Sequence, residues 1–231
     1  MKKKGGFINM VDFIKLMKDI RSKYDDEIGT YDDEIDSYTE DFCDAVIEEG
    51  RKAGANIDYN YGATQLCFIE EDNFDYVIKM PFVNKGGISY DDDYEEDWCD
   101  TYNHDYTQEC AEIYKKAVDA GVAMFFAEVE YVGDGMWKQE FVTARERTSS
   151  PRIEKISKGD IERAQILRYE YCCGNFDATW IVDCLFYYGQ ELFDKFMAFI
   201  DKENINDLHN GNYGWSKSGY PRLLDYSGYY E

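Results

Sequence analysis

The spacing of hydrophobic residues changes several times along this chain, and the order of those changes limits the fold more than any other feature. Blocks with apolar residues every three or four positions, typical of amphipathic helices, are separated by the short apolar runs typical of strands. Helices are predicted over residues 7–24, 38–53, 105–120 and 177–201, and strands within residues 57–80 and 124–144. Because helices and strands come in groups rather than in regular alternation, the sequence predicts an α+β fold.

The same pattern divides the 231 residues into three parts. Residues 1–55 hold the first two helices, residues 56–144 hold the strands and one helix, and residues 145–231 hold further helices and a loop-rich end. The Thr-Ser-Ser-Pro stretch at 148–151 has the composition of a linker near the second boundary.

Acidic residues outnumber basic ones by 48 to 25, which gives a formal net charge of −23. Nucleic acids and anionic membranes attract clustered Lys and Arg, so we expect neither as a partner. Nor does any apolar stretch approach the roughly 18 residues of a membrane span. Aromatic residues make up 17% of the chain, which indicates a folded protein despite the charge.

Cysteine and histidine content narrows the possible metal sites and the compartment. Seven cysteines occur without a CxxC pair, which favours reduced thiols in the cytoplasm over a disulfide framework or a zinc site. His104 and His209 are the only histidines, too few for a histidine-based metal cluster. Residues 91–97 hold six acids but lack the glycine and the ligand spacing of a calcium loop, so we expect a solvated loop there.

One short segment and one later aspartate carry the chemical signal. Asp207, His209, Gly211 and Asn212 follow the pattern D-x-H-x-G-N, and Asp225 comes thirteen residues after Asn212. Taken alone, the segment is also compatible with an Asn- and Gly-rich turn that has no chemistry. With Asp225 at that distance, the chain resembles the protein-kinase-like superfamily, specifically its aminoglycoside-phosphotransferase-type branch.

This resemblance implies an Mg-ATP-dependent phosphotransferase, in which a carboxylate orients the acceptor hydroxyl and oxygen ligands hold Mg²⁺ against the phosphates. By resemblance Asp207 is the catalytic base, His209 a positioning residue of the loop, and Asn212 and Asp225 the metal ligands. The family's Asp-Phe-Gly metal motif is met here by Asp225-Tyr226-Ser227-Gly228, with one inserted or substituted position.

Further upstream, Lys79 ends the sequence Tyr-Val-Ile-Lys on a predicted strand, which is similar to the family's strand lysine. The resemblance implies that Lys79 contacts the α- and β-phosphates of ATP and pairs with a helix glutamate. Glu109 is the preferred partner and Glu112 the alternative. Gly62 corresponds to the glycine turn over the phosphates. Singly, a strand lysine or a helix glutamate is more often a solvated surface residue, so the argument depends on their order along the chain.

Glu140 and Val142, at the end of the strand after the Gly-Asp-Gly turn at 133–135, are expected at the hinge near the adenine. The implied fold has two lobes, with residues 56–144 as the kinase-like N-lobe, residues 145–231 as an abbreviated helical C-lobe, and an N-terminal helical extension. The chain stops three residues after Gly228, where family members usually continue into further helices.

A long apolar helix over residues 177–201 then needs a cover. We expect the helices at 7–24 and 38–53, a second copy of the chain or another protein partner to supply it. Besides the phosphotransferase with an unknown protein or small-molecule acceptor, two functions stay open. One is a catalytically silent kinase-like module that binds a nucleotide or a protein. The other is an acidic interaction protein whose field suits a basic partner.

Overall fold

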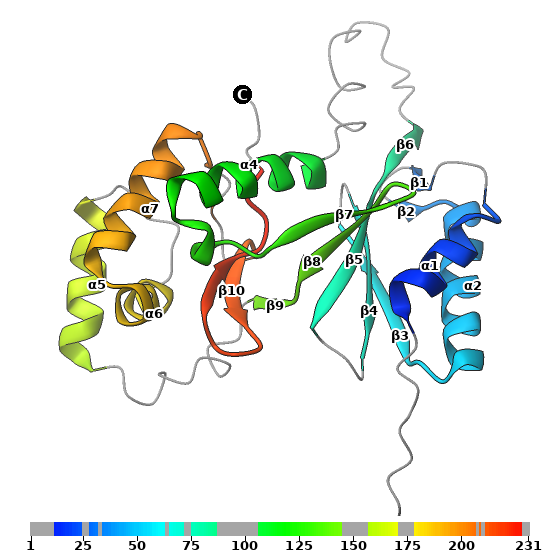
Figure 1. Cartoon of the computed structure of the whole chain (residues 1–231), viewed down its shortest axis with the longest axis horizontal. Helices are drawn as coiled ribbons and strands as arrows, with labels where there is room; N and C mark the ends of the chain where they lie inside the picture. The colour runs from blue at the N-terminus through cyan, green and yellow to red at the C-terminus, as the bar shows by residue number, and fades with distance from the viewer. Residues whose placement is uncertain are drawn as a thin grey trace, which may run out of the picture. The chain divides into compact units, whose positions relative to one another are not determined.

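The computed structural model describes residues 12–24, 28–31, 34–62, 65–71, 75–86, 106–144, 157–170, 178–206, 208 and 211–227. Asp207, His209, the acidic residues 91–97 and the linker at 148–151 lie outside these ranges. Helices and strands are both present in the described part of the chain, and the fold is α+β as the sequence predicts (Figure 1).

The helices are α1 (Phe13–Arg21), α2 (Ser37–Ala53), α4 (Tyr106–Ala120), α5 (Lys158–Glu170), α6 (Ala178–Tyr188) and α7 (Gln190–Lys202), with a short 3₁₀ helix η1 (Ala123–Phe125). The strands are β1 (Gly29–Tyr31), β2 (Glu34–Ile35), β3 (Ile57–Tyr61), β4 (Gln65–Glu70), β5 (Tyr76–Pro81), β6 (Val83–Gly86), β7 (Val129–Gly133), β8 (Met136–Glu140), β9 (Val142–Ala144), β10 (Tyr213–Ser216) and β11 (Pro221–Leu223). The predicted helices at 38–53 and 105–120 are confirmed by α2 and α4.

Three strand orders describe the sheets: β3-β4-β5-β8-β7, β2-β1-β6 and β11-β10-β9. The chain divides into two compact units. The first unit comprises Met1–Asn73, Ile78–His104 and Val132–Met136, and the second comprises Phe74–Val77, Asp105–Tyr131 and Trp137–Glu231.

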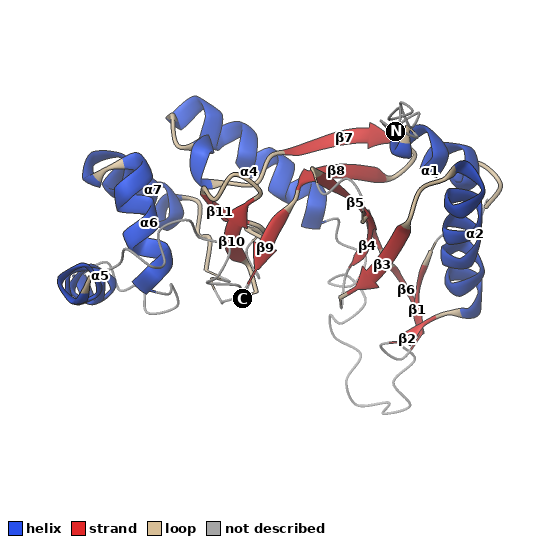
Figure 2. Cartoon of the chain, turned by 90° about the horizontal axis from the view of Figure 1, so that it is seen from below, coloured by secondary structure: helices blue, strands red, loops and turns tan. Residues whose placement is uncertain are grey.

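In the first unit α1 and α2 lie side by side next to β3 and β4 in both views (Figures 1 and 2). The rings of Phe42 on α2 and Phe68 on β4 meet edge to face at 5.8 Å. Helix α2 begins where the Asp36 side chain accepts a hydrogen bond from the Thr39 amide (2.6 Å) and ends at Gly54, whose φ of 86° suits glycine. These two helices therefore form a core with the strands of their own unit.

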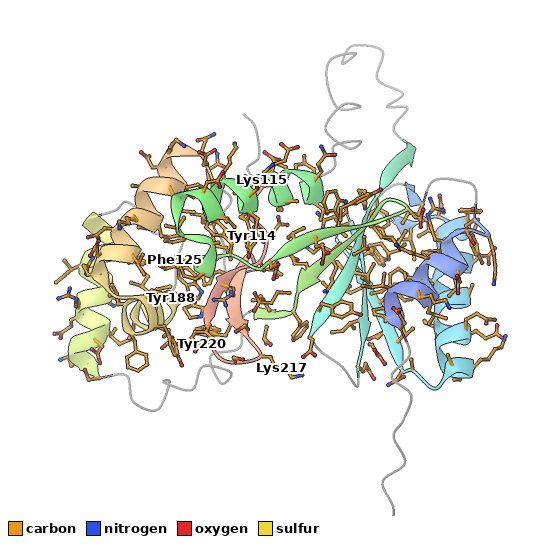
Figure 3. All side chains as sticks on the ribbon, in the orientation of Figure 1. Tyr114, Lys115, Phe125, Tyr188, Lys217 and Tyr220 are labelled. Atoms are coloured by element: carbon orange, nitrogen blue, oxygen red, sulfur yellow. The ribbon has the colours of Figure 1, made fainter. Side chains whose placement is uncertain are left out.

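The second unit contains a large aromatic core between α4, η1, α6, α7 and the β10–β11 hairpin. Phe125 of η1 stacks on Phe196 of α7 at 4.3 Å between ring centroids and lies 4.5 Å from the ring of Tyr188 (Figure 3). Trp180 of α6 is fully buried among the same elements. This unit thus has its own hydrophobic core.

The predicted single helix at 177–201 is wrong, because two helices, α6 and α7, occupy this stretch. The break is at Gly189, whose φ of 81° lies in the left-handed region that only glycine adopts readily. The chain turns there, and the apolar residues of both helices reach one core instead of forming one long face. That core is covered by α4, η1 and β10–β11 of the same unit, so it does not need the cover expected from residues 7–24 and 38–53.

Candidate functional site

The β10–β11 hairpin brings two of the predicted metal ligands together. Tyr213 pairs with Leu223, so Asn212 just before β10 lies opposite the residues just after β11. The Asn212 carbonyl accepts hydrogen bonds from the Leu224 amide (2.7 Å) and the Asp225 amide (3.3 Å). A thirteen-residue separation is therefore closed by one antiparallel hairpin.

Asp225 is half-buried and its carboxylate has polar neighbours. Its Oδ1 accepts a hydrogen bond from the Ser227 hydroxyl (3.2 Å) and lies 3.6 Å from the Cys110 thiol on α4. The following residue, Tyr226, is fully buried, and its hydroxyl donates to the Ala127 carbonyl (2.7 Å). Burial, followed by the nearby Cys110, raises the pKa of Tyr226, which keeps this hydroxyl protonated as a donor.

Helix α4 distinguishes the two glutamates that were candidates for the lysine partner. Glu109 is half-buried and directly precedes Cys110, the residue that contacts Asp225. Glu112 is exposed and accepts a hydrogen bond from the Gln108 side chain (3.1 Å). Glu109 is thus the less exposed of the two and the sequence neighbour of a residue that contacts Asp225, whereas Glu112 pairs with a side chain of its own helix.

Lys79 lies on β5 in the first unit and is only 7% exposed. A solvated surface lysine would be far more exposed, so that interpretation of Lys79 is wrong. Lysine is almost never buried unless its ammonium group is paired, because desolvating a charge is costly. The low exposure of Lys79 therefore sets it apart from the solvated lysines of a protein surface.

Gly62 directly follows β3, and its amide donates to the Gln65 carbonyl (3.0 Å) across the β3–β4 turn. The two strands pair in antiparallel register from Ile57–Glu70 to Tyr61–Leu66, within the stretch where the sequence predicts strands, while residues 63 and 64 lie outside the described ranges. A Cβ at Gly62 would meet no atom within 4 Å, and its φ is not in the left-handed region. Neither space nor backbone conformation demands glycine there.

The two residues predicted at the hinge lie at the junction of β8 and β9. The Glu140 carboxylate accepts a hydrogen bond from Arg222 Nε (3.0 Å), and the Glu140 amide donates to the Glu128 carbonyl (2.9 Å). Val142 is buried and pairs with Ser216 of β10. The side chain of Glu140 is therefore committed to a contact within the protein.

A hollow of about 310 Å³ opens beside Glu140. It is lined by Asp75, Tyr76, Glu128, Glu130, Lys138 and Glu140. The Lys138 ammonium lies 3.7 Å from the Glu130 carboxylate and 5.0 Å from the centre of the Tyr76 ring. The Lys138 ammonium group therefore already balances part of the negative charge of the carboxylates that line this hollow.

As a test of metal fit, Asn212 and Asp225 offer an amide oxygen and a carboxylate, which are donors that Mg²⁺ accepts. No group of three or more His, Cys, Asp or Glu side chains in the described ranges is arranged to hold a metal ion. Mg²⁺ in nucleotide sites needs only one or two protein carboxylates, because phosphates and water complete its shell. With these two donors alone, most of the shell of a magnesium ion would have to come from phosphates and water.

Three residues near the site escaped the sequence-based reasoning: Gln139, Tyr226 as a buried anchor, and Arg222. Gln139 shares a strand face with the buried Trp137, and a polar residue on an apolar face was the one available signal. The sequence around Arg222 held no such signal, because its hydrogen-bond partners come from distant parts of the chain.

Comparisons of the whole chain with protein-family models and with curated proteins found no match. None of the helices in the described ranges combines the length and the apolar character needed to cross a bilayer.

Proposed function

We propose that this chain is an Mg-ATP-dependent phosphotransferase of the protein-kinase-like type, which transfers the γ-phosphate to a hydroxyl of a protein or a small molecule. In this proposal residues 56–144 form the N-lobe and residues 145–231 a helical C-lobe, with α1 and α2 as an N-terminal extension. These lobes do not coincide with the two compact units, because α4 and residues 137–144 belong to the second unit. The buried Cys43, Cys110 and Cys184 of the described residues are not in disulfides, which agrees with a reducing, cytoplasmic compartment.

The observation that carries the proposal is the pairing of Asn212 with the Leu224–Asp225 backbone. Phosphoryl transfer requires oxygen ligands that hold Mg²⁺ against the phosphates in a fixed geometry. A short hairpin is a rigid way to fix the spacing of two ligands, because its strands are hydrogen-bonded up to the residues that carry them. Asp207, five residues before Asn212, would orient the acceptor hydroxyl and take its proton.

Lys79 supports the proposal from the first unit. Its burial is expected of a phosphate-binding lysine that is held by a carboxylate partner, and Glu109 would be that partner. The proposal requires Lys79→Met and Glu109→Gln to weaken Mg-ATP binding to a similar extent, and the double variant to lose less than the sum. Glu112→Gln is the matched control and should bind as the wild type does.

Thermal unfolding with ATP, with and without Mg²⁺, tests the function itself. A bound ligand at 100 times its Kd stabilises the folded state by about 2.7 kcal/mol, which is easily measured. We expect a magnesium-dependent stabilisation in the wild type that Asp225→Asn abolishes. Asp201→Asn, an exposed carboxylate on α7, should keep it. A wild type without any magnesium-dependent shift would contradict the proposal.

One observation favours the alternative of a silent nucleotide-binding or protein-binding module. The amide of Gly62 is used within the β3–β4 turn and is not available to cradle a phosphate. Phosphate release from ATP, or transfer to an acceptor, separates the two functions. Turnover that Asp207→Asn removes without loss of Mg-ATP binding identifies an enzyme, and binding without turnover in the wild type identifies the silent module.

A further inference from the structure

Two buried side chains hold the backbone on either side of Asp225. Gln139 on β8 is fully buried, and its Nε2 donates a hydrogen bond to the Leu224 carbonyl (2.7 Å). Tyr226 is also fully buried, and its hydroxyl donates to the Ala127 carbonyl (2.7 Å). We name these two hydrogen bonds the Asp225 clamp.

Glutamine at position 139 lowers the stability of the fold through one of its side-chain atoms. Its Oε1 is buried and accepts no hydrogen bond from the described residues. An unsatisfied buried acceptor is unfavourable, and an apolar side chain of the same size would avoid that penalty. Core packing therefore does not account for glutamine here, whereas the bond from Nε2 to Leu224 does.

Other contacts fix the same short segment from the opposite direction. The Ala127 amide donates to the Leu223 carbonyl (2.7 Å), and the Leu224 and Asp225 amides donate to the Asn212 carbonyl. The ring of Phe126 meets that of Tyr226 edge to face at 4.9 Å. The backbone from Leu223 to Tyr226 is thus anchored on both sides, with Asp225 as the half-buried residue in its middle.

We propose that Gln139 and Tyr226 are positioning residues for Asp225, which hold its carboxylate ready to bind the metal before any ligand arrives. The inference rests on the proposed function, because it assigns Asp225 the role of metal ligand. A ligand held in place by packed neighbours loses little conformational freedom on binding, so it binds the metal more tightly than a mobile one. In this protein the metal-binding carboxylate is preset by the fold and needs no separate ordering step.

Gln139→Met and Tyr226→Phe each remove one bond of the clamp and keep the side-chain volume. The matched control is Tyr24→Phe, which removes a hydroxyl that donates to the Asp41 carbonyl (3.0 Å) in the first unit. Binding of Mn²⁺ in the presence of ATP, followed by electron paramagnetic resonance, measures the affinity of the metal site. Since one hydrogen bond contributes about 1 kcal/mol, each clamp variant should bind Mn²⁺ about five- to tenfold more weakly.

Binding of ATP without metal should not change in the clamp variants, and excess Mn²⁺ should restore full occupancy. Gln139→Met removes the unsatisfied Oε1 but also the donor to the Leu224 carbonyl, so the two effects oppose each other and the urea midpoint should stay close to that of the wild type. Amide hydrogen exchange at Leu224 and Asp225 should become faster in both variants and stay unchanged in Tyr24→Phe.

The outcomes separate the two proposals. If the wild type binds Mn²⁺ with ATP and the clamp variants bind it equally well, the clamp has no positioning role and the proposed function stands. If the wild type binds no Mn²⁺ with ATP, the proposed function is wrong and the positioning role is overturned with it. Unchanged exchange at Leu224 and Asp225 in both variants would also overturn the clamp, whatever the metal does.

Discussion

Arg222 makes several side-chain contacts near the candidate site, and its removal should be strongly destabilising. From β11 its Nε donates to the Glu140 carboxylate (3.0 Å), and its guanidinium also donates to the Met124 carbonyl (2.5 Å) and to the Tyr188 hydroxyl. The side chains of Arg222 and Glu140 are only 16% and 28% exposed. Arg222→Met would leave the part-buried Glu140 carboxylate and Tyr188 hydroxyl without this donor, whereas the Met124 carbonyl is in an exposed contact.

The size of the expected destabilisation follows from the burial of Arg222 and Glu140. A hydrogen bond to a charged group contributes about 1.5–3 kcal/mol, and breaking a fully buried ion pair costs about 3–5 kcal/mol. Because the pair is partly exposed, solvent screening reduces the upper figure. We expect Arg222→Met to lower the free energy of unfolding by about 3 kcal/mol. Arg222→Lys keeps the charge but loses the planar fork, and should cost about half as much.

Lys217 supplies a matched control from the same hairpin (Figure 3). Its ammonium lies 2.7 Å from the Asp75 carboxylate, a shorter contact than that of Arg222, but the two side chains are 61% and 62% exposed. Exposed pairs contribute about 0–1 kcal/mol, so Lys217→Met should have little effect. Urea unfolding followed by tryptophan fluorescence measures both variants. Equal destabilisation by Lys217→Met and Arg222→Met would refute the argument from burial.

Three further predictions test other parts of the fold. Phe196→Ala should lower the free energy of unfolding by about 3–5 kcal/mol because it empties a stacked core position, while Phe186→Ala, at 59% exposure, should change the urea midpoint little. Gly62→Ala should be neutral and Gly54→Ala should cost about 1 kcal/mol or more, since both sites are open but only Gly54 has a positive φ of 86°, and thermal melts of the two would show no difference if φ did not matter. Burial raises the pKa of Cys43 from 9.0 to about 12, so its contribution to stability is complete below pH 9 and is lost as the pH rises towards 12. Urea titrations should therefore show a fall with pH that is shallower in Cys43→Ala by about 1.4 kcal/mol per pH unit in that window, and parallel curves would contradict this assignment.

Local signals in the sequence predicted local structure well. The helix at 38–53 has apolar residues at helical spacing, an Asp cap before it and a glycine after it, and the structure places α2 there. The break at Gly189 was missed because both flanking segments keep their apolar character, so periodicity alone continues across it. A single glycine inside a helical pattern is often tolerated, and only the tertiary core decides that this one turns the chain.

The residues of the candidate site also fall into those that the sequence indicated and those that it did not. Asn212 and Asp225 were expected together only from the family resemblance, and the structure shows the short hairpin that joins them. Gln139 could not be connected with Leu224, since the two residues are 85 positions apart and nothing in either local sequence specifies the pairing. The contacts of Arg222 with Met124, 98 positions away, are of the same kind. Such long-range polar contacts depend on packing, which hydrophobic periodicity does not encode.

The hairpin that carries Asn212 and Asp225 is supported by the helices of its own unit. Trp180 Nε1 on α6 donates to the Gly214 carbonyl of β10 (3.0 Å), and Trp215 Nε1 of β10 donates back to the Asp183 carboxylate of α6 (2.8 Å). Both bonds are buried, where a hydrogen bond is electrostatically stronger than in water. This reciprocal pair of hydrogen bonds between α6 and β10 therefore holds the hairpin against the helices. The turn at Gly189 contributes to this arrangement, because it lets α7 pack on the core while α6 supports the hairpin.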